Sequence, residues 1–354
     1  MAAWRPMTLA QDSPDVPPPP ERLYTAEDLF AAWDPDDPMS AAATFDFATY
    51  ATTRRQGSRV PATRQIAEAR AAHDVAVSWL LAETLNDRFP VAIMGGHAMS
   101  RDETRYELIA RLAHRLADTG FTILSGGGPG AMEAAHLGAR CVGSKTGIDK
   151  ALDIIRAGGG GGGKDQTSDD DGRLRFPFHN ADVLFDAAGA VVPEEVERLH
   201  RWQTPAFELA ARTASDPGPS IGIPTWLYGH EPPTPLATQH AKYFENSIRE
   251  DGLLGVATAG VVFAPGKAGT LQEIFQDAAQ NYYTTFGDRF SPMVFLDIDE
   301  YWTVEYNVRS VLERLFDDSQ ELNMAWVTTA EEAVDVLVAA NPDVRSTRAQ
   351  RSSG

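Results

Sequence analysis

Apolar residues in the central part of the chain form short continuous runs that alternate with helical patterns. An apolar run bounded by glycine or proline predicts a strand buried on both faces, and apolar residues at three- and four-residue steps predict an amphipathic helix. The predicted strands cover residues 90–94, 121–124, 221–226, 261–264, 293–296 and 324–327, and the predicted helices cover residues 62–85, 106–117, 131–139, 152–156, 244–250, a segment from 271 onward, and 331–340. This alternation predicts an α/β fold: a doubly wound, Rossmann-like, mostly parallel sheet with helices on both faces.

The helix over residues 62–85 is predicted from its apolar positions, which include Ile66, Val75, Trp79 and Leu80. These positions recur at three- and four-residue steps, which is the pattern of a helix.

The remaining pattern divides the chain into three parts. Residues 1–60 form an acidic, proline-rich N-terminal extension, which carries nine acidic and two basic residues in its first 50 positions. This composition predicts an extended and largely unpacked segment, in which Leu29, Phe30 and Trp33 can dock as one short turn. Residues 61–340 form the Rossmann-like domain, with a less regular insertion at about 141–220, and residues 341–354 form a flexible tail. The insertion contains six consecutive glycines, residues 158–163, and an acidic run, residues 169–171, which predict a surface loop.

Charge and composition limit the partners. The chain has 31 Lys and Arg against 50 Asp and Glu, a net charge of −19, which argues against a nucleic-acid polymer but leaves room for one small phosphate in a local pocket. No run approaches the ~20 apolar residues of a membrane span, and the first residues lack the apolar core of a signal peptide, so we expect a cytoplasmic protein without membrane contact. The single cysteine, Cys141, predicts a buried thiol, and the eight histidines show no metal-ligand spacing, so we expect neither metal nor cofactor.

Three short motifs are compatible with other functions but fit their surroundings poorly. Residues 158–164 match part of a phosphate-binding P-loop, but Asp165 stands where Ser or Thr is needed and no strand precedes the segment. Residues 218–222 match the GxSxG nucleophile elbow, but they precede a strand instead of following one. Residues 126–131 match a dinucleotide fingerprint in the right context, and the acid that should hold the ribose would be Asp149, although no convincing strand leads into it.

Glycine-rich turns at the ends of separate strands are the stronger signal. They occur at residues 95–96, 125–130 and 265–270, and each of the last two opens a predicted helix. Glycine lets the backbone approach an anion closely, and a helix N-terminus offers free N–H groups and a partial positive charge. In a doubly wound sheet such turns can meet at one switch point, which predicts a phosphate site there.

Two of these segments resemble elements of a known family. Ser-Gly-Gly-Gly-Pro-Gly-Ala-Met-Glu-Ala-Ala, residues 125–135, is similar to the GGGPGxMEAA element of the Lonely Guy (LOG) family, and Pro-Gly-Lys-Ala-Gly-Thr-Leu-Gln-Glu, residues 265–273, is similar to its PGGxGTxxE element. Residues 229–235, Gly-His-Glu-Pro-Pro-Thr-Pro, resemble the larger bacterial branch, the nucleotide 5′-monophosphate nucleosidases. The resemblance extends over about residues 89–340. It implies hydrolysis of the N-glycosidic bond of a nucleoside monophosphate to free base and ribose 5-phosphate, without cofactor, by a homo-oligomer; plant-type members act on cytokinin nucleotides.

The resemblance also implies two catalytic residues. Glu273 matches the family's catalytic glutamate, and a carboxylate there can stabilise an oxocarbenium-like ribose or activate water. The alternative is a capping box in which Glu273 reaches back toward Thr270 at the helix start. Arg249 lies one residue off the spacing of the family's arginine and can hold the phosphate or orient the substrate. Its alternative is a solvated arginine paired with Glu245.

The remaining candidates for substrate binding come from the three glycine turns and the residues beside them. Lys267 departs from the family, which usually has glycine there, and this puts the tight geometry of the loop in doubt. Met132 is equally compatible with core packing. Two other functions stay open: a nucleotide-binding sensor or carrier without turnover, and a dinucleotide-dependent oxidoreductase. The candidates are Gly95, Gly96, His97, Gly127, Gly128, Gly130, Met132, Glu133, Gly266, Lys267, Ala268, Gly269 and Thr270.

Overall fold

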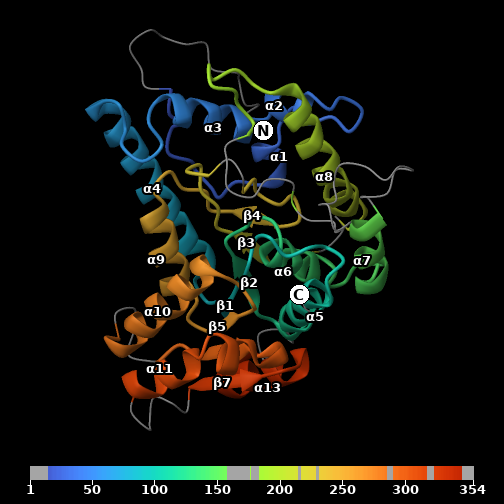
Figure 1. Ribbon diagram of the computed structural model, residues 1–354, viewed down its shortest axis with the longest axis vertical. Coiled ribbons are helices and arrows are strands. Elements are labelled where there is room, and N and C mark those ends of the chain that lie inside the picture. The colour runs from blue at the N-terminus through green and yellow to red at the C-terminus, as the bar shows by residue number, and fades with distance from the viewer. Residues whose placement is uncertain are drawn as a thin grey trace.

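A seven-stranded parallel sheet forms the centre of the computed structural model (Figure 1). The structure describes residues 15–157, 176, 183–213, 217–228, 231–284, 290–316 and 323–344. The strands are β1 (Pro90–Met94), β2 (Thr122–Ser125), β3 (Ser220–Gly222), β4 (Gln239–His240), β5 (Gly260–Phe263), β6 (Met293–Leu296) and β7 (Met324–Val327). Their order is β4-β3-β2-β1-β5-β6-β7, and every neighbouring pair is parallel. The chain therefore winds outward from β1 on one side and from β5 on the other, which places the switch point between these two strands.

Helices cover both faces of the sheet, as the sequence predicts. They are α4 (Arg64–Leu85), α5 (Thr104–Thr119), α6 (Ala131–Arg140), α7 (Ile148–Ala157), α8 (Pro193–Arg212), α9 (Asn246–Val256), α10 (Ala268–Tyr282), α11 (Val308–Leu315) and α13 (Ala330–Ala340), with two short helical turns, η1 (Ile298–Glu300) and η2 (Tyr301–Glu305). One face packs on α5, α6 and α13 and the other on α4, α9, α10 and α11. Alternate side chains of β1 enter the two cores, Val91 and Ile93 on one side and Ala92 and Met94 on the other, which explains its continuous apolar run. The predicted α/β fold is confirmed.

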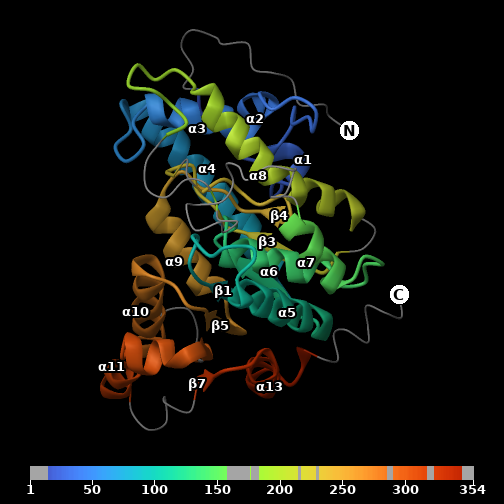
Figure 2. The same ribbon diagram turned by 45° about the vertical axis from the view of Figure 1, so that its right-hand side comes forward.

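The N-terminal extension is packed over its described residues, so the expectation of an unpacked segment is wrong from residue 15 onward. It contains α1 (Ala26–Leu29), α2 (Ser40–Ala43) and α3 (Phe45–Arg55), which gather with α8 at one end of the molecule (Figures 1 and 2). The predicted docking of Leu29 and Phe30 is confirmed, because both are buried. Tyr24 exchanges two backbone hydrogen bonds with His240 and so adds an antiparallel bridge beside β4. The prediction was based on the many prolines and acidic residues of this segment. The apolar residues between them pack against α8 and Trp226.

The predicted helix over residues 62–85 is confirmed as α4, and it buries polar as well as apolar residues. Val77, Leu80, Leu81 and Leu85 pack in the core, and Arg70, His73 and Asp74 are buried as well, while Val75 and Trp79 are 67% and 62% exposed. Arg70 donates hydrogen bonds to the carbonyl oxygens of Gly57 and Thr53, at 2.7 and 3.2 Å, because the N-terminal extension covers this side of the helix. Polar partners in the extension therefore add to apolar packing in orienting α4.

The insertion is more regular than predicted, since it contains the 20-residue helix α8. The glycine run 158–163, the acidic run 169–171, residues 229–230 and the tail from residue 345 lie outside the described residues. The predicted strand over 221–226 is short: β3 ends at Gly222, although the following residues are buried. None of the helices that the structure describes has the length and apolarity needed to cross a bilayer. Cys141 is buried, and burial raises the pKa of its thiol to about 12.

The described residues support neither of two alternative motifs, and the P-loop match at residues 158–164 lies outside the described residues. Asp149 is in the first turn of α7, follows no strand, and is ion-paired with Arg111 at 2.6 Å on the surface, so it is not the ribose-binding acid of a dinucleotide site. Ser220 is fully buried at the start of β3, so it is not at a strand-to-helix elbow.

Candidate functional site

The three glycine turns meet at the carboxyl ends of β1, β2 and β5, at the switch point. The amide of Gly96 donates to the carbonyl of Pro265 at 3.3 Å, and the carbonyl of Gly96 accepts from the amide of Ala131 at 3.1 Å. The turn after β1 thus contacts the turns after both neighbouring strands. This convergence is what the sequence predicts for a ligand site.

The turn between β2 and α6 is filled by protein. Residues 126–130 are all buried. Gly130 has φ +67°, and a Cβ added there would lie 2.5 Å from the Gly96 carbonyl oxygen; Gly127 has φ +73° and lies close to Gly222. Met132 lies against this turn, since a Cβ at Gly126 would be 2.6 Å from its sulfur. Glycine is required here mainly for close packing of backbone on backbone.

A buried hydrogen-bond pair supports the same turn from below. The Ser125 hydroxyl accepts a hydrogen bond from the amide of Gly127 at 3.0 Å and pairs with Nε2 of His136 at 2.8 Å. Burial lowers the pKa of His136 to about 3, so the ring is neutral at ordinary pH. The pair therefore fixes the turn without placing a charge beneath it.

The turn between β5 and α10 is open by contrast. Lys267, Ala268 and Gly269 are exposed, and α10 begins at Ala268. Tyr301 in η2 donates from its hydroxyl to the carbonyl oxygen of Gly266 at 2.6 Å, which holds the turn in place. Because an α-helix leaves its first N–H groups without intrahelical acceptors, this end of α10 can accept a phosphate. Lys267 has φ −108°, so the loop does not require glycine at this position.

Arg249 on α9 lies beside the turn between β2 and α6, which we call the closed turn because its residues 126–130 are buried. It is only 6% exposed, and its Nη2 lies 3.4 Å from the position of a Cβ on Gly126. Among the described residues its Nε has no hydrogen-bond partner. A solvated arginine paired with Glu245 is thus not what the structure contains. A buried guanidinium with a free donor is suited to bind an anionic or hydroxylated ligand.

Glu273 lies one turn into α10, within the electrostatic reach of Arg249. Burial raises the pKa of its carboxyl to about 8; Arg249 opposes this rise, while Glu250 and Glu231 add to it. The capping box does not form, because Lys267 is the N-cap of α10 and no side chain caps its first turn. Glu273 is therefore available for chemistry, and a carboxyl with a strongly perturbed pKa is typical of a functional group.

Glu133 is a different case among the predicted binding residues. It is fully buried, and Arg101 donates to both of its oxygens at 2.7 and 2.8 Å. The Tyr106 hydroxyl donates to it as well, at 2.9 Å. Arg101 in turn lies over the ring of Trp202, 3.9 Å from its centroid. Glu133 thus links α6 to α5 and α8 and holds the helix that follows the closed turn; its oxygens do not face the cleft.

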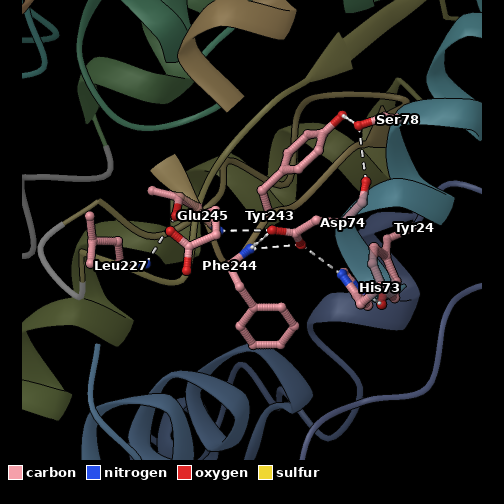
Figure 3. Close-up of polar contacts among 9 residues, drawn as sticks. Tyr24, His73, Asp74, Ser78, Leu227, Tyr243, Phe244 and Glu245 are labelled. Atoms are coloured by element: carbon pink, nitrogen blue, oxygen red, sulfur yellow. Dashed lines mark hydrogen bonds and ion pairs between the residues drawn. The ribbon is translucent and has the colours of Figure 1, made fainter. Parts of the chain in front are cut away.

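The start of α9 is fixed by a network that the sequence did not reveal. Both oxygens of Asp74 accept hydrogen bonds from the backbone amides of Phe244 and Glu245, at 2.9 to 3.2 Å (Figure 3). Asp74 also pairs with Nδ1 of His73 at 3.0 Å, and Nε2 of His73 pairs with the hydroxyl of Tyr24 at 2.8 Å. The network connects the N-terminal extension, α4 and the N-terminal end of α9. It therefore sets the position from which Arg249 reaches the cleft.

His97 and Glu231 form a second polar pair at the cleft. Nδ1 of His97 and Oε1 of Glu231 are 3.4 Å apart, and the side chains are 33% and 17% exposed. Glu231 lies beside Gly128, since a Cβ there would be 3.6 Å from the Cβ of Glu231. His97 was predicted from the sequence as a binding residue, whereas Glu231 was not. Glu231 nevertheless belongs to the Glu-Pro-Pro-Thr-Pro segment, which contributes to the family resemblance.

Comparison with protein families finds a match over part of the chain. Residues 88–152 match the family model called SLOG cluster4 family. This match supports placing the chain in the SLOG superfamily. It spans β1 to α7 and includes the first two glycine turns, whereas Arg249 and Glu273 lie beyond it. No curated protein matches the chain. The match is compatible with nucleotide processing. A specific reaction has to be argued from the residues of the site, because one fold supports many functions.

Proposed function

We propose that the chain hydrolyses the N-glycosidic bond of nucleoside 5′-monophosphates, releasing free base and ribose 5-phosphate. The observation that carries this proposal is the electrostatic interaction of the buried Arg249 with Glu273, beside the exposed N-terminus of α10. The LOG-like motifs at residues 125–135 and 265–273 support it, because they contribute both turns and the glutamate.

The phosphate is the first part of the substrate to be held. The backbone N–H groups at the start of α10, from Gly266 to Thr270, bind it through hydrogen bonds and the helix dipole. Lys267 is exposed beside this turn and adds positive charge near it. In a chain of net charge −19, this local arrangement is what admits an anion.

The reaction then proceeds at the anomeric carbon. As the bond between C1′ and the base nitrogen breaks, its electron pair leaves with the base and the ribose becomes oxocarbenium-like. The carboxylate of Glu273 stabilises that cation and takes a proton from the attacking water, whose oxygen forms the new bond to C1′. Arg249 orients the substrate against this carboxylate. Glu273 then passes this proton to the departing base nitrogen, which regenerates the carboxylate and gives free base and ribose 5-phosphate.

Base release from a nucleotide panel tests the proposal. The purified chain is incubated with AMP, GMP, CMP, UMP and cytokinin nucleotides, and free base and ribose 5-phosphate are measured by chromatography. Glu273→Gln is expected to lower the rate at least about 100-fold, as loss of a catalytic base does. Glu250→Gln is the control, because it removes a nearby negative charge on α9 outside the cleft, where Glu250 bonds Asn246 and Gln272.

Two outcomes would contradict the proposal. No base release from any of these nucleotides would remove the enzymatic claim, and tight nucleotide binding without release would identify a sensor or carrier. Full activity of Glu273→Gln would exclude Glu273 from the mechanism while leaving the reaction in place.

A further inference from the structure

The His97–Glu231 pair has no part in the reaction described above, yet both residues lie beside the glycine turns. His97 follows Gly96 directly, and Gly96 contacts Pro265 in the open turn through its amide. Glu231 raises the pKa of Glu273, which places both carboxyls in one electrostatic environment. The pair is thus next to the phosphate turn on one side and near the catalytic carboxyl on the other.

The segment after Glu231 is held firmly against the sheet. The amide of Thr234 donates to the carbonyl of Gly127 at 2.8 Å, and the Thr234 carbonyl bonds Nε2 of the buried His240 at 2.9 Å. Residues 232–237 are buried. Glu231 therefore projects from a fixed anchor and not from a freely moving loop.

Substrate geometry assigns a task to a carboxylate at this position. In a nucleoside monophosphate, the ribose hydroxyls are separated from the 5′-phosphate by only a few bonds, so a group beside the phosphate turn can reach them. A carboxylate accepts hydrogen bonds from a vicinal diol, which is how acidic residues hold ribose in nucleotide-binding folds. His97 engages one oxygen of Glu231 and fixes the orientation of the carboxylate, while the other oxygen can accept a hydroxyl.

We propose that Glu231, oriented by His97, accepts a hydrogen bond from the ribose 2′-hydroxyl and thereby selects ribonucleotides over 2′-deoxyribonucleotides. This inference rests on the proposed function, because it assumes a nucleoside monophosphate bound with its phosphate at α10. Glu231 is then a substrate-binding residue and His97 a positioning residue.

Calorimetric binding of AMP and 2′-deoxy-AMP to the Glu273→Gln protein tests the inference without depending on turnover. A charged hydrogen bond to the 2′-hydroxyl predicts roughly 10- to 100-fold tighter binding of AMP. Glu231→Gln in the same background should reduce this preference to within about threefold by weakening AMP binding and leaving 2′-deoxy-AMP unchanged. His97→Gln should reduce it in part, because Glu231 keeps its charge but loses its orientation.

The control is again Glu250→Gln, which removes one negative charge near Glu273 and should keep the full preference. Thermal unfolding of each variant verifies that it is folded. Equal weakening of both nucleotides by Glu231→Gln would overturn the inference, as would a wild-type preference smaller than threefold. Absence of binding for both nucleotides would overturn the proposed function together with the inference, so the two failures are distinguishable.

Discussion

The two glycine-rich turns have similar sequences and opposite surroundings. Residues 126–130, after β2, are buried under backbone and side chains, whereas Lys267 to Gly269, after β5, are exposed to solvent. In the first turn glycine permits contacts that a Cβ would block; in the second turn Gly266 does the same against Thr270, whereas Gly269 has no atom within 4 Å of an added Cβ. The comparison shows that a glycine-rich turn between strand and helix indicates close approach but does not say what approaches.

A matched pair of alanine substitutions gives the largest expected contrast. Gly130→Ala would force a side chain into a φ of +67° and against the Gly96 carbonyl, so we expect a loss of about 3 kcal/mol or more in the free energy of unfolding. Gly269→Ala meets no atom within 4 Å and lies in the first turn of α10, so we expect a change below about 1 kcal/mol.

Denaturant unfolding of both variants measures the difference. In AMP binding by the folded proteins, Gly269→Ala should have the larger effect and Gly130→Ala the smaller one, because the added methyl group at residue 269 hinders the phosphate. Similar stability losses in the two variants would show that both turns serve packing alone.

The pH dependence of Glu273 should be the next largest effect. Its carboxyl has a raised pKa of about 8 in the folded protein, so the unfolded chain loses its proton near pH 4.5 while the folded protein keeps it. The contribution of this group to stability is therefore fully present below pH 4.5 and is lost as pH rises toward 8. Glu273→Gln should remove this loss and be more stable than the wild type by about 2 kcal/mol at pH 8, with little difference at pH 4.5.

Base release should change in the opposite direction. The ionised carboxylate is the active form, so the wild-type kcat/KM should rise as pH increases through about 8. Thermal unfolding of the wild type and Glu273→Gln between pH 4.5 and 9 measures the first effect, and initial rates measure the second. A kcat/KM that falls across this range would instead indicate that Glu273 acts as an acid.

Lys267→Gly should have the smallest effect. Lys267 is exposed and has a φ that is ordinary for any residue, so the substitution should change stability by less than about 1 kcal/mol. Its charge acts at a solvent-exposed position, so we expect AMP binding to weaken by about threefold, and less at high salt. Calorimetry at two salt concentrations distinguishes this screened contribution from direct coordination, which would persist in high salt.

The sequence predicted the parts of the fold that depend on local pattern. The buried runs of β1, β2, β5 and β6 were predicted close to their observed places, because a strand covered on both faces must be apolar throughout. The glycine turns after β1, β2 and β5 were predicted as well. The meeting of Gly96, Ala131 and Pro265 follows from the topology that these runs imply.

The parts that depend on distant partners were not predicted. Arg70 and Asp74 are buried on α4 because carbonyls of the extension and amides before α9 satisfy them, and neither partner is visible from the helix itself. Glu133 matched a family motif, yet its ion pair with Arg101 depends on residues 32 positions apart. Glu231 lies beside Gly128 because the amide of Thr234, three residues later, donates to the carbonyl of Gly127. No periodicity in the sequence predicts this hydrogen bond.

The backbone bridge between Tyr24 and His240 has a consequence for the behaviour of the protein in concentrated solution. Strand β4 is an outermost strand of the sheet, and an uncovered outer strand offers unpaired N–H and C=O groups on which another chain can assemble. By occupying those groups of His240, the extension removes part of this template. A chain lacking residues 1–57 should therefore show a greater tendency to self-associate into β-rich aggregates, which light scattering and a cross-β dye would reveal.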